Sequence, residues 1–161
     1  MTKKCLIIGS GESKNLVTDI EFNGDIISCH GILHKNTNIV CSSDTSKFKD
    51  KELKAIENNI KLVIGIHIFH KKKQIPEEYH SKIEFYECKH ILTSGIMAIE
   101  WAIKQGYDVI YTAGLDFYNQ KLHIKIENKI KEVITEWVNE GINIYKVDEK
   151  SILPIEIKLP K

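Results

Sequence analysis

The sequence predicts an α/β fold of Rossmann-like type, in which a mainly parallel sheet carries helices on both faces. Short apolar runs alternate with helical segments along the chain, and turn residues separate them. The runs are apolar almost throughout rather than at every second position, which indicates strands buried on both faces. A length of 161 residues suits one core, so residues 1–161 are expected to form a single domain.

Strands are expected wherever a short run is rich in β-branched or aromatic residues and bounded by turn residues. These runs are residues 5–9, 25–29, 38–42, 61–66, 82–86, 108–114 and 142–147. Because helical segments separate several of them, parallel pairing through crossover connections is expected.

Helices are expected at residues 95–105, 124–139 and 49–59. The first ends at Gly106, a residue type that commonly follows a helix C-terminus. The second repeats apolar side chains at steps of three and four residues, which predicts one buried face. That face comprises Ile126, Ile130, Val133, Ile134, Trp137 and Val138.

The C-terminal tail, residues 150–161, is apolar and contains two prolines. It is expected to pack either on the chain's own core or on a partner subunit.

Composition excludes two classes of protein. The chain is 42% hydrophobic and 28% charged, which is typical of globular domains and not of disordered chains. Its 23 basic and 22 acidic residues leave a net charge of +1, so no basic face for non-specific nucleic-acid binding is expected. Every basic residue is Lys, and an anion would therefore be bound without an arginine fork.

The cysteines, Cys5, Cys29, Cys41 and Cys88, form no CxxC pair and fall mostly in predicted strands. They are expected to be buried thiols in a reducing compartment. The N-terminal apolar run is too short for a signal sequence or a membrane span, so a cytoplasmic protein without a transmembrane segment is expected.

For the histidines outside the candidate site, the sequence predicts ordinary loop or surface positions. His67 and His70 have metal-like spacing only on a helix, and their stretch is expected to be a solvated loop. His34, His80 and His90 have polar neighbours and are expected on the surface. No metal site is predicted.

Ligands of parallel α/β sheets bind beyond the carboxyl ends of the strands, where the strand order reverses. After the first predicted strand comes GSGES, residues 9–13, whose small residues let backbone amides approach a ligand. Ser10 and Ser13 add hydroxyl groups. The turn is neither GxGxxG nor a Walker A loop, so nucleotide binding and a plain tight turn both remain open.

A second candidate lies where the helix at 95–105 begins. Thr93, Ser94 and Gly95 could present hydroxyls and first-turn amides to a phosphate or a carboxylate. Ordinary capping of the helix by Thr93 or Ser94 would explain the same residues.

The run TSGIMAIEWAIKQGYDVIYTAGLDFY, residues 93–118, resembles the central signature of the bacterial sialyltransferases of glycosyltransferase family 42. That signature is a TSG turn, a helix, Gly-Tyr, and a strand ending in a G-[IL]-D-F-Y loop. LIIGSGES is similar to the family's first strand and nucleotide loop, and ISCHG to its next strand. Residues 123–147 are similar to the segment in which a catalytic His opens a helix, so the resemblance covers most of 1–147 discontinuously.

The resemblance implies a nucleotide-sugar donor, CMP-linked, and inverting transfer to an acceptor hydroxyl without a metal or another cofactor. Tyr118 would donate a proton to the departing phosphate, and His123 would take the proton of the acceptor. The acceptor could be a glycan, a lipid-linked sugar or a modified nucleobase. The implied nucleotide-binding residues are Gly9, Ser10, Gly11, Ser13, His30, Thr93, Ser94, Gly95 and Asp116.

The sequence departs from the family in its loops. Ser10 and His30 each stand where the family has Asn, and Glu12 stands where it has Pro. The family's lid between the DFY loop and the catalytic His is replaced by residues 119–122. A neighbouring subunit of a homo-oligomer could complete such a site.

Two further hypotheses stay open. The same Gly-rich opening and TSG…GxD pattern also look like the domain of unknown function shared with archaeal 6-hydroxymethylpterin diphosphokinases. Such an enzyme would need Mg²⁺ and acidic ligands, for which Asp44 and Asp116 are the candidates. Alternatively, the chain is a non-catalytic nucleotide-binding module.

Overall fold

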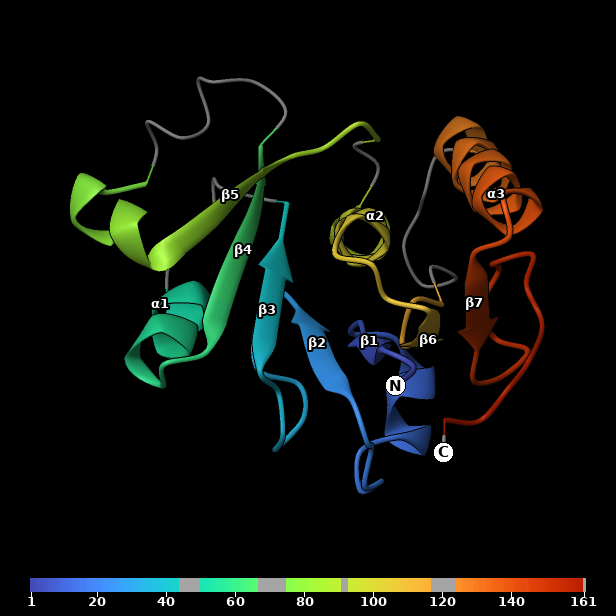
Figure 1. Ribbon diagram of the computed structural model, residues 1–161, viewed down its shortest axis with the longest axis horizontal. Helices are drawn as coiled ribbons and strands as arrows, with labels where there is room; N and C mark the ends of the chain where they lie inside the picture. The colour runs from blue at the N-terminus through green and yellow to red at the C-terminus, as the bar shows by residue number, and fades with distance from the viewer. Residues whose placement is uncertain (44–49, 67–74, 91–92, 117–123, 161) are drawn as a thin grey trace.

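The computed structural model describes residues 1–43, 50–66, 75–90, 93–116 and 124–160. Their strands form one parallel sheet in the order β5-β4-β3-β2-β1-β6-β7 (Figure 1). The strands are β1 (Lys4–Ile8), β2 (Asp25–Cys29), β3 (Ile39–Ser42), β4 (Lys61–Ile66), β5 (Ile83–Glu87), β6 (Val109–Ala113) and β7 (Asn143–Lys146). Each pairing is parallel, as the apolar runs predicted.

The strand order reverses at β1. The chain adds β2 to β5 on one side of β1 and then crosses back to place β6 and β7 on the other side. Ile8, the last residue of β1, pairs with Ser28 of β2 and with Ala113 of β6. The switch point, where parallel α/β folds bind ligands, therefore lies at the carboxyl ends of β1 and its two neighbours.

Helical segments cover both faces of the sheet. The 3₁₀ helix η1 (Glu12–Leu16) and α1 (Asp50–Glu57) lie on one face, and α2 (Ser94–Lys104) and α3 (Ile124–Asn139) lie on the other (Figure 1). A further 3₁₀ helix, η4 (Glu77–Lys82), precedes β5. Connections between parallel strands are right-handed, so the direction in which the chain crosses the sheet decides which face the connecting helix covers. The chain moves in one direction up to β5 and in the opposite direction after it, and its helices therefore lie on two faces. The predicted Rossmann-like fold is confirmed.

The main core lies between the sheet and the α2–α3 layer. All of α2 from Ser94 to Ala102 is buried, which explains why its sequence is apolar on almost every side. On the opposite face the apolar residues form two separate clusters, one around Leu6 and Val17 beneath η1 and one around Leu62 and Ala55 beneath α1. Between these clusters the sheet carries polar side chains at Ser28 and Ser42.

A buried carboxylate fixes the segment that leads from β5 into α2. Glu100 of α2 accepts hydrogen bonds from the Tyr86 hydroxyl at 2.9 Å and from the backbone amides of Lys89 and His90 at 2.7 and 2.8 Å. Burial, together with the hydrogen bond to Glu100, raises the pKa of Tyr86. The phenol therefore stays a neutral donor.

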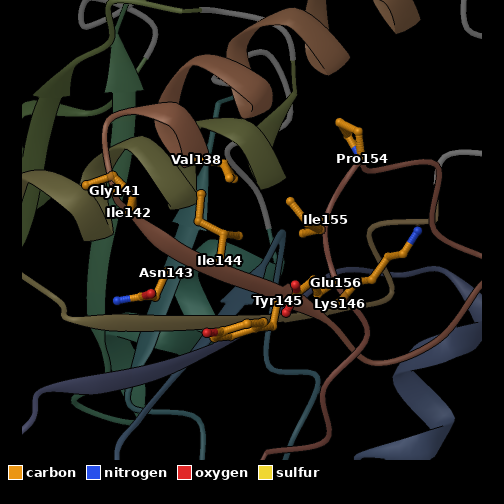
Figure 2. A pocket seen from close by; sticks show the side chains of 10 residues that line it. All are labelled: Val138, Gly141, Ile142, Asn143, Ile144, Tyr145, Lys146, Pro154, Ile155 and Glu156. Carbon is orange, nitrogen blue, oxygen red and sulfur yellow. The ribbon is translucent and has the colours of Figure 1, made fainter.

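The C-terminal tail packs on the chain's own core. Leu153 is fully buried, and the Ser151 hydroxyl donates to the carbonyl of Leu115 at 3.1 Å. The Lys146 ammonium donates to the carbonyls of Ser151 and Leu153. A cavity of about 540 Å³ lies between β7, the end of α3 and this tail. Figure 2 shows the side chains that line it, among them Ile144 and Ile155.

Two expectations about burial are wrong. Ile126 and Val138 of α3 are 36% and 40% exposed, because only the stripe Ile130, Val133, Ile134 and Trp137 reaches the main core. His34 is 4% exposed rather than on the surface. Its turn folds back on itself: the Thr37 hydroxyl donates to the His34 carbonyl at 2.7 Å, and the His34 Nδ1 accepts from the Asn36 amide.

His80 and His90, which were also expected on the surface, are half-buried. His80 Nε2 lies 2.9 Å from the carbonyl of Ile75, and the His90 ring stands edge-on to Trp137. His67 and His70 lie outside the described residues.

The expectation of buried cysteines is confirmed, since all four are buried thiols. Burial raises the pKa of Cys29 to about 12.

Among the described residues, no helix combines the length and apolarity needed to cross a membrane.

The observed placement of α3 can be tested with the same substitution, Val to Ala, at two positions of the helix. Val133→Ala removes buried methyl groups and is expected to cost about 2 kcal/mol of unfolding free energy. Val138→Ala on the same helix is expected to change it by less than about 0.5 kcal/mol, because that side chain is partly in water. Urea unfolding followed by circular dichroism measures both. Equal losses at the two positions would contradict this placement.

Candidate functional site

The loops that follow β1 and β6 are joined by a ladder of backbone hydrogen bonds. The amide of Gly9 donates to the carbonyl of Ala113 at 2.8 Å, and the amide of Gly11 donates to that of Gly114 at 2.9 Å. The pairing of β1 with β6 thus continues past the strand ends. The two loops form one rigid unit at the switch point.

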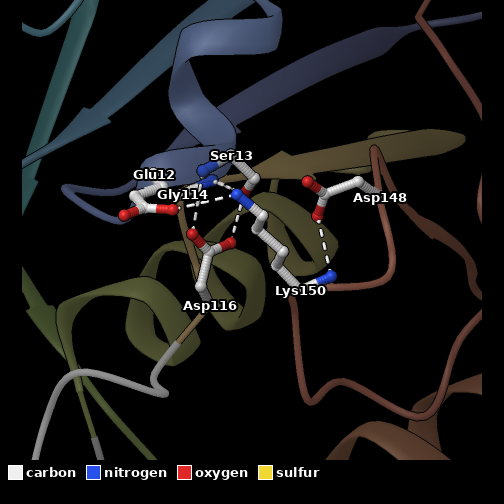
Figure 3. Close-up of polar contacts among 6 residues, drawn as sticks. All are labelled: Glu12, Ser13, Gly114, Asp116, Asp148 and Lys150. Atoms are coloured by element: carbon white, nitrogen blue, oxygen red, sulfur yellow. Dashed lines mark hydrogen bonds and ion pairs between the residues drawn. The ribbon is translucent and has the colours of Figure 1, made fainter.

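Two buried side chains complete this unit. The Ser13 amide and hydroxyl both donate to the Asp116 carboxylate, and the Ser13 hydroxyl accepts from the Gly114 amide at 2.7 Å (Figure 3). Ser13 is 2% exposed and Asp116 is 1% exposed. Both residues were predicted to bind the nucleotide, and both have a structural role here that needs no ligand.

The glycines of GSGES are required by the same close approach. A Cβ at Gly9 would lie 2.4 Å from the carbonyl oxygen of Gly114, and a Cβ at Gly11 would lie 2.4 Å from Asp116 Oδ2. A Cβ at Gly95 would lie 2.5 Å from Leu115 Cδ2. Loop packing alone therefore accounts for these three glycines.

The start of α2 is tied to its neighbours by both predicted hydroxyls. Thr93 is the N-cap, and its hydroxyl oxygen accepts from the Ile96 amide at 3.2 Å. The Ser94 hydroxyl accepts from the Ser43 amide at 2.8 Å and pairs with the Ser43 hydroxyl at 2.9 Å. Capping accounts for Thr93, while Ser94 connects α2 to the segment that follows β3.

An open cavity of about 720 Å³ lies beside this unit, beyond the carboxyl ends of β1 and β2. Its volume is in the range of small-molecule and cofactor sites. Two predicted residues, Ser10 and His30, are exposed and line it. The residues that line it are Ser10, Cys29, His30, Gly31, Ile32, Leu33, Asp50, Lys51, Glu52 and Lys54.

His30 is held in the left-handed region with φ of 64°, which is uncommon for a residue with a Cβ. Its amide donates to the carbonyl of Cys41 at 3.0 Å, and its Nδ1 lies 3.5 Å from the Ser42 hydroxyl. These contacts hold the imidazole at the end of β2, on the wall of the cavity. Strained conformations of this kind cluster at functional sites, so His30 stays a strong candidate.

Sequence reasoning missed the wall contributed by α1. Lys51, Glu52 and Lys54 line the cavity, although no site residue was predicted on the helix at 49–59. Glu52 is 4% exposed and accepts from the Ser42 hydroxyl at 3.4 Å. One feature of the sequence could have indicated this wall: α1 is the helix that follows β3, so its first turn comes after the carboxyl end of that strand.

Charges at the rim of the β1 loop are paired. Glu12 forms an exposed ion pair with Lys150 of the tail at 2.9 Å (Figure 3), a type of contact that contributes little to stability. The Lys14 ammonium donates to the carbonyl of Ser10 at 3.2 Å, which places a positive charge beside the loop.

The predicted catalytic pair, Tyr118 and His123, lies outside the described residues, and so does Asp44. Their positions relative to the cavity stay a prediction.

Fold and site together define an α/β domain with a parallel sheet, a reversal of strand order at β1 and a ligand-sized cavity at the carboxyl edge. No known family model matches the sequence. An uncharacterized protein of Haemophilus influenzae is 38% identical over 90 residues, which span 51% of this chain and 38% of that protein. The chain thus matches well under half the length of this relative.

Among solved structures, thiamine pyrophosphokinase from Bacillus subtilis is similar with a TM-score of 0.43 and 13% identity. The similarity covers 91% of this chain and 61% of that protein. Nothing about the activity of this chain follows from a likeness of that size.

Two matched serine variants test the buried unit. Ser13→Ala leaves the Gly114 amide without its acceptor and removes a donor from Asp116, so we expect a loss of about 2 kcal/mol of unfolding free energy. Ser10→Ala, at an exposed position of the same loop, is expected to stay within about 0.5 kcal/mol of the parent. Chemical denaturation measures both. A Ser13→Ala protein as stable as the parent would show that the hydrogen bonds add no net stability.

Proposed function

We propose that this chain binds a nucleotide at the carboxyl edge of its sheet and transfers a sugar from that nucleotide to an acceptor hydroxyl. The observation that supports the nucleotide site is the cavity of about 720 Å³ at the ends of β1 and β2. The residues that line it include Ser10, His30 and Lys51, whose side chains carry a hydroxyl, an imidazole and an ammonium group. This is the place and the chemistry at which parallel α/β domains bind phosphorylated ligands.

The phosphate end of the ligand belongs at the β1 loop. Ser10 is exposed there, and Lys14 holds its ammonium group against the Ser10 carbonyl. Lys51 supplies a second positive charge, with its aliphatic stem beside Gly31. In a chain without arginine, lysines serve as point charges for an anion.

The transfer step rests on the resemblance to the bacterial sialyltransferases. A CMP-linked sugar would lose its CMP to attack by an acceptor hydroxyl, with inversion at the anomeric carbon. His123 would take the proton of the acceptor, and Tyr118 would donate a proton to the departing phosphate. Neither role requires a metal ion.

The competing Mg²⁺-dependent diphosphokinase needs carboxylates available to the metal ion. Asp116 accepts the hydroxyl and amide hydrogens of Ser13 on its two carboxylate oxygens, so this group is already engaged. An enzyme of that class would bind its nucleotide only with Mg²⁺. A non-catalytic module would bind the nucleotide without sugar transfer.

Calorimetric titration with CMP, CDP, UDP and GDP, each with and without Mg²⁺, tests the proposal. We expect CMP to bind without the metal. Lys51→Ala should weaken CMP binding about tenfold, since it removes a charged contact worth about 1.4 kcal/mol. The control Lys129→Ala, on the exposed face of α3, should leave binding unchanged.

The outcomes separate the hypotheses. Binding of CMP that survives His123→Ala, together with loss of sugar transfer in that variant, supports the proposed roles. Strictly Mg²⁺-dependent binding of a diphosphate would favour the diphosphokinase. Failure of every nucleotide to bind would overturn the proposal.

A further inference from the structure

Glu52 is a buried carboxylate in the wall of the cavity. It is 4% exposed, yet it lines the open space together with His30 and Lys51. Burying an ionised carboxylate is costly unless hydrogen-bond donors compensate it. One such donor is the Ser42 hydroxyl at 3.4 Å, and Ser42 is itself 1% exposed.

Polar residues that line the cavity, together with the buried Ser42 that contacts Glu52, follow the strand ends in spatial order. Ser10 comes after β1, His30 after β2, and Ser42 ends β3, with Glu52 beside it. These strands are neighbours in the sheet, and neighbouring strands lie about 4.8 Å apart. The β1 loop is therefore roughly 10 Å from Ser42 and Glu52, two strand spacings away. A nucleoside monophosphate is long enough to place its phosphate at one end and its base at the other.

The geometry points to Glu52 as the residue that determines base specificity: it accepts a hydrogen bond from an exocyclic amino group and so selects cytosine over uracil. This inference rests on the proposed nucleotide binding. Cytosine presents the N4 amino donor where uracil presents the O4 acceptor, and an ionised carboxylate only accepts. A ligand amino group can therefore donate to Glu52 in addition to its existing partners, whereas a carbonyl oxygen placed there would set two acceptors against each other in a buried position.

Ser42 acts as the positioning residue. Its hydroxyl lies 3.4 Å from Glu52 Oε1 and 3.5 Å from His30 Nδ1, so it connects the two side chains at the base end of the cavity. A carboxylate accepts several hydrogen bonds at once, and the Ser42 contact is therefore compatible with a ligand amino group.

The test compares CMP with UMP, whose bases differ in the group at C4, an amino group or a carbonyl oxygen, and at N3, which accepts a hydrogen bond in cytosine and donates one in uracil. For the wild-type protein we expect calorimetry to give CMP at least about tenfold tighter binding than UMP. In Glu52→Gln the side-chain amide can donate to O4, so the ratio should fall to within about threefold. Glu57→Gln is the matched control, because Glu57 is exposed on the same helix, and it should keep the wild-type ratio.

Each alternative result bears on a different claim. Measurable but equal binding of CMP and UMP to the wild-type protein overturns the role of Glu52 and leaves nucleotide binding standing. Equal weakening of both ligands in Glu52→Gln, with the ratio unchanged, shows a structural role and also overturns it. No binding of either ligand overturns nucleotide binding itself, and the inference with it.

A second variant tests the role of Glu52 in base selection if Glu52→Gln does not fold. Ser42→Ala removes the positioning contact without changing charge, and it should lower the CMP-to-UMP ratio about threefold while the protein stays folded by circular dichroism. An unchanged ratio in folded Ser42→Ala would contradict the inference.

Discussion

The arrangement of the carboxyl edge depends on the buried hydrogen bonds between Ser13 and Asp116. They join two loops that are 103 residues apart in sequence and fix them at the point where the strand order reverses. A carboxylate with 1% exposure is tolerated there because the Ser13 amide and hydroxyl compensate its charge. The close approach that makes these bonds also excludes a side chain at Gly9 and Gly11.

This constraint determines where a ligand can sit. Backbone and buried side chains fill the space between the β1 and β6 loops, so the open cavity lies on the other side of the β1 loop, over β2 and toward α1. On the same face of the sheet the apolar residues form two clusters, and the buried Ser28 and Ser42 occupy the strip between them.

The sequence predicts the sheet and the helices well, since both follow from local periodicity. The apolar runs become the strands, and Gly106 has a positive φ of 73° after the helix it was expected to end. Ser10 and His30 could also be placed at the cavity, because they directly follow strands. Glu52 could not, since an acidic residue on a short charged helix looks solvated until Ser42 and the cavity wall enclose it. Likewise, nothing local indicates that Ser13 and Asp116 bind each other rather than a phosphate.

A crystal structure of the protein with CMP is the most direct test of the proposed site, because it locates phosphate and base at the same time. We expect the phosphate beside the β1 loop at Ser10 and the cytosine amino group within about 3 Å of the Glu52 carboxylate. CMP bound in the cavity between β7 and the C-terminal tail, with the carboxyl edge of β1 and β2 empty, would contradict it.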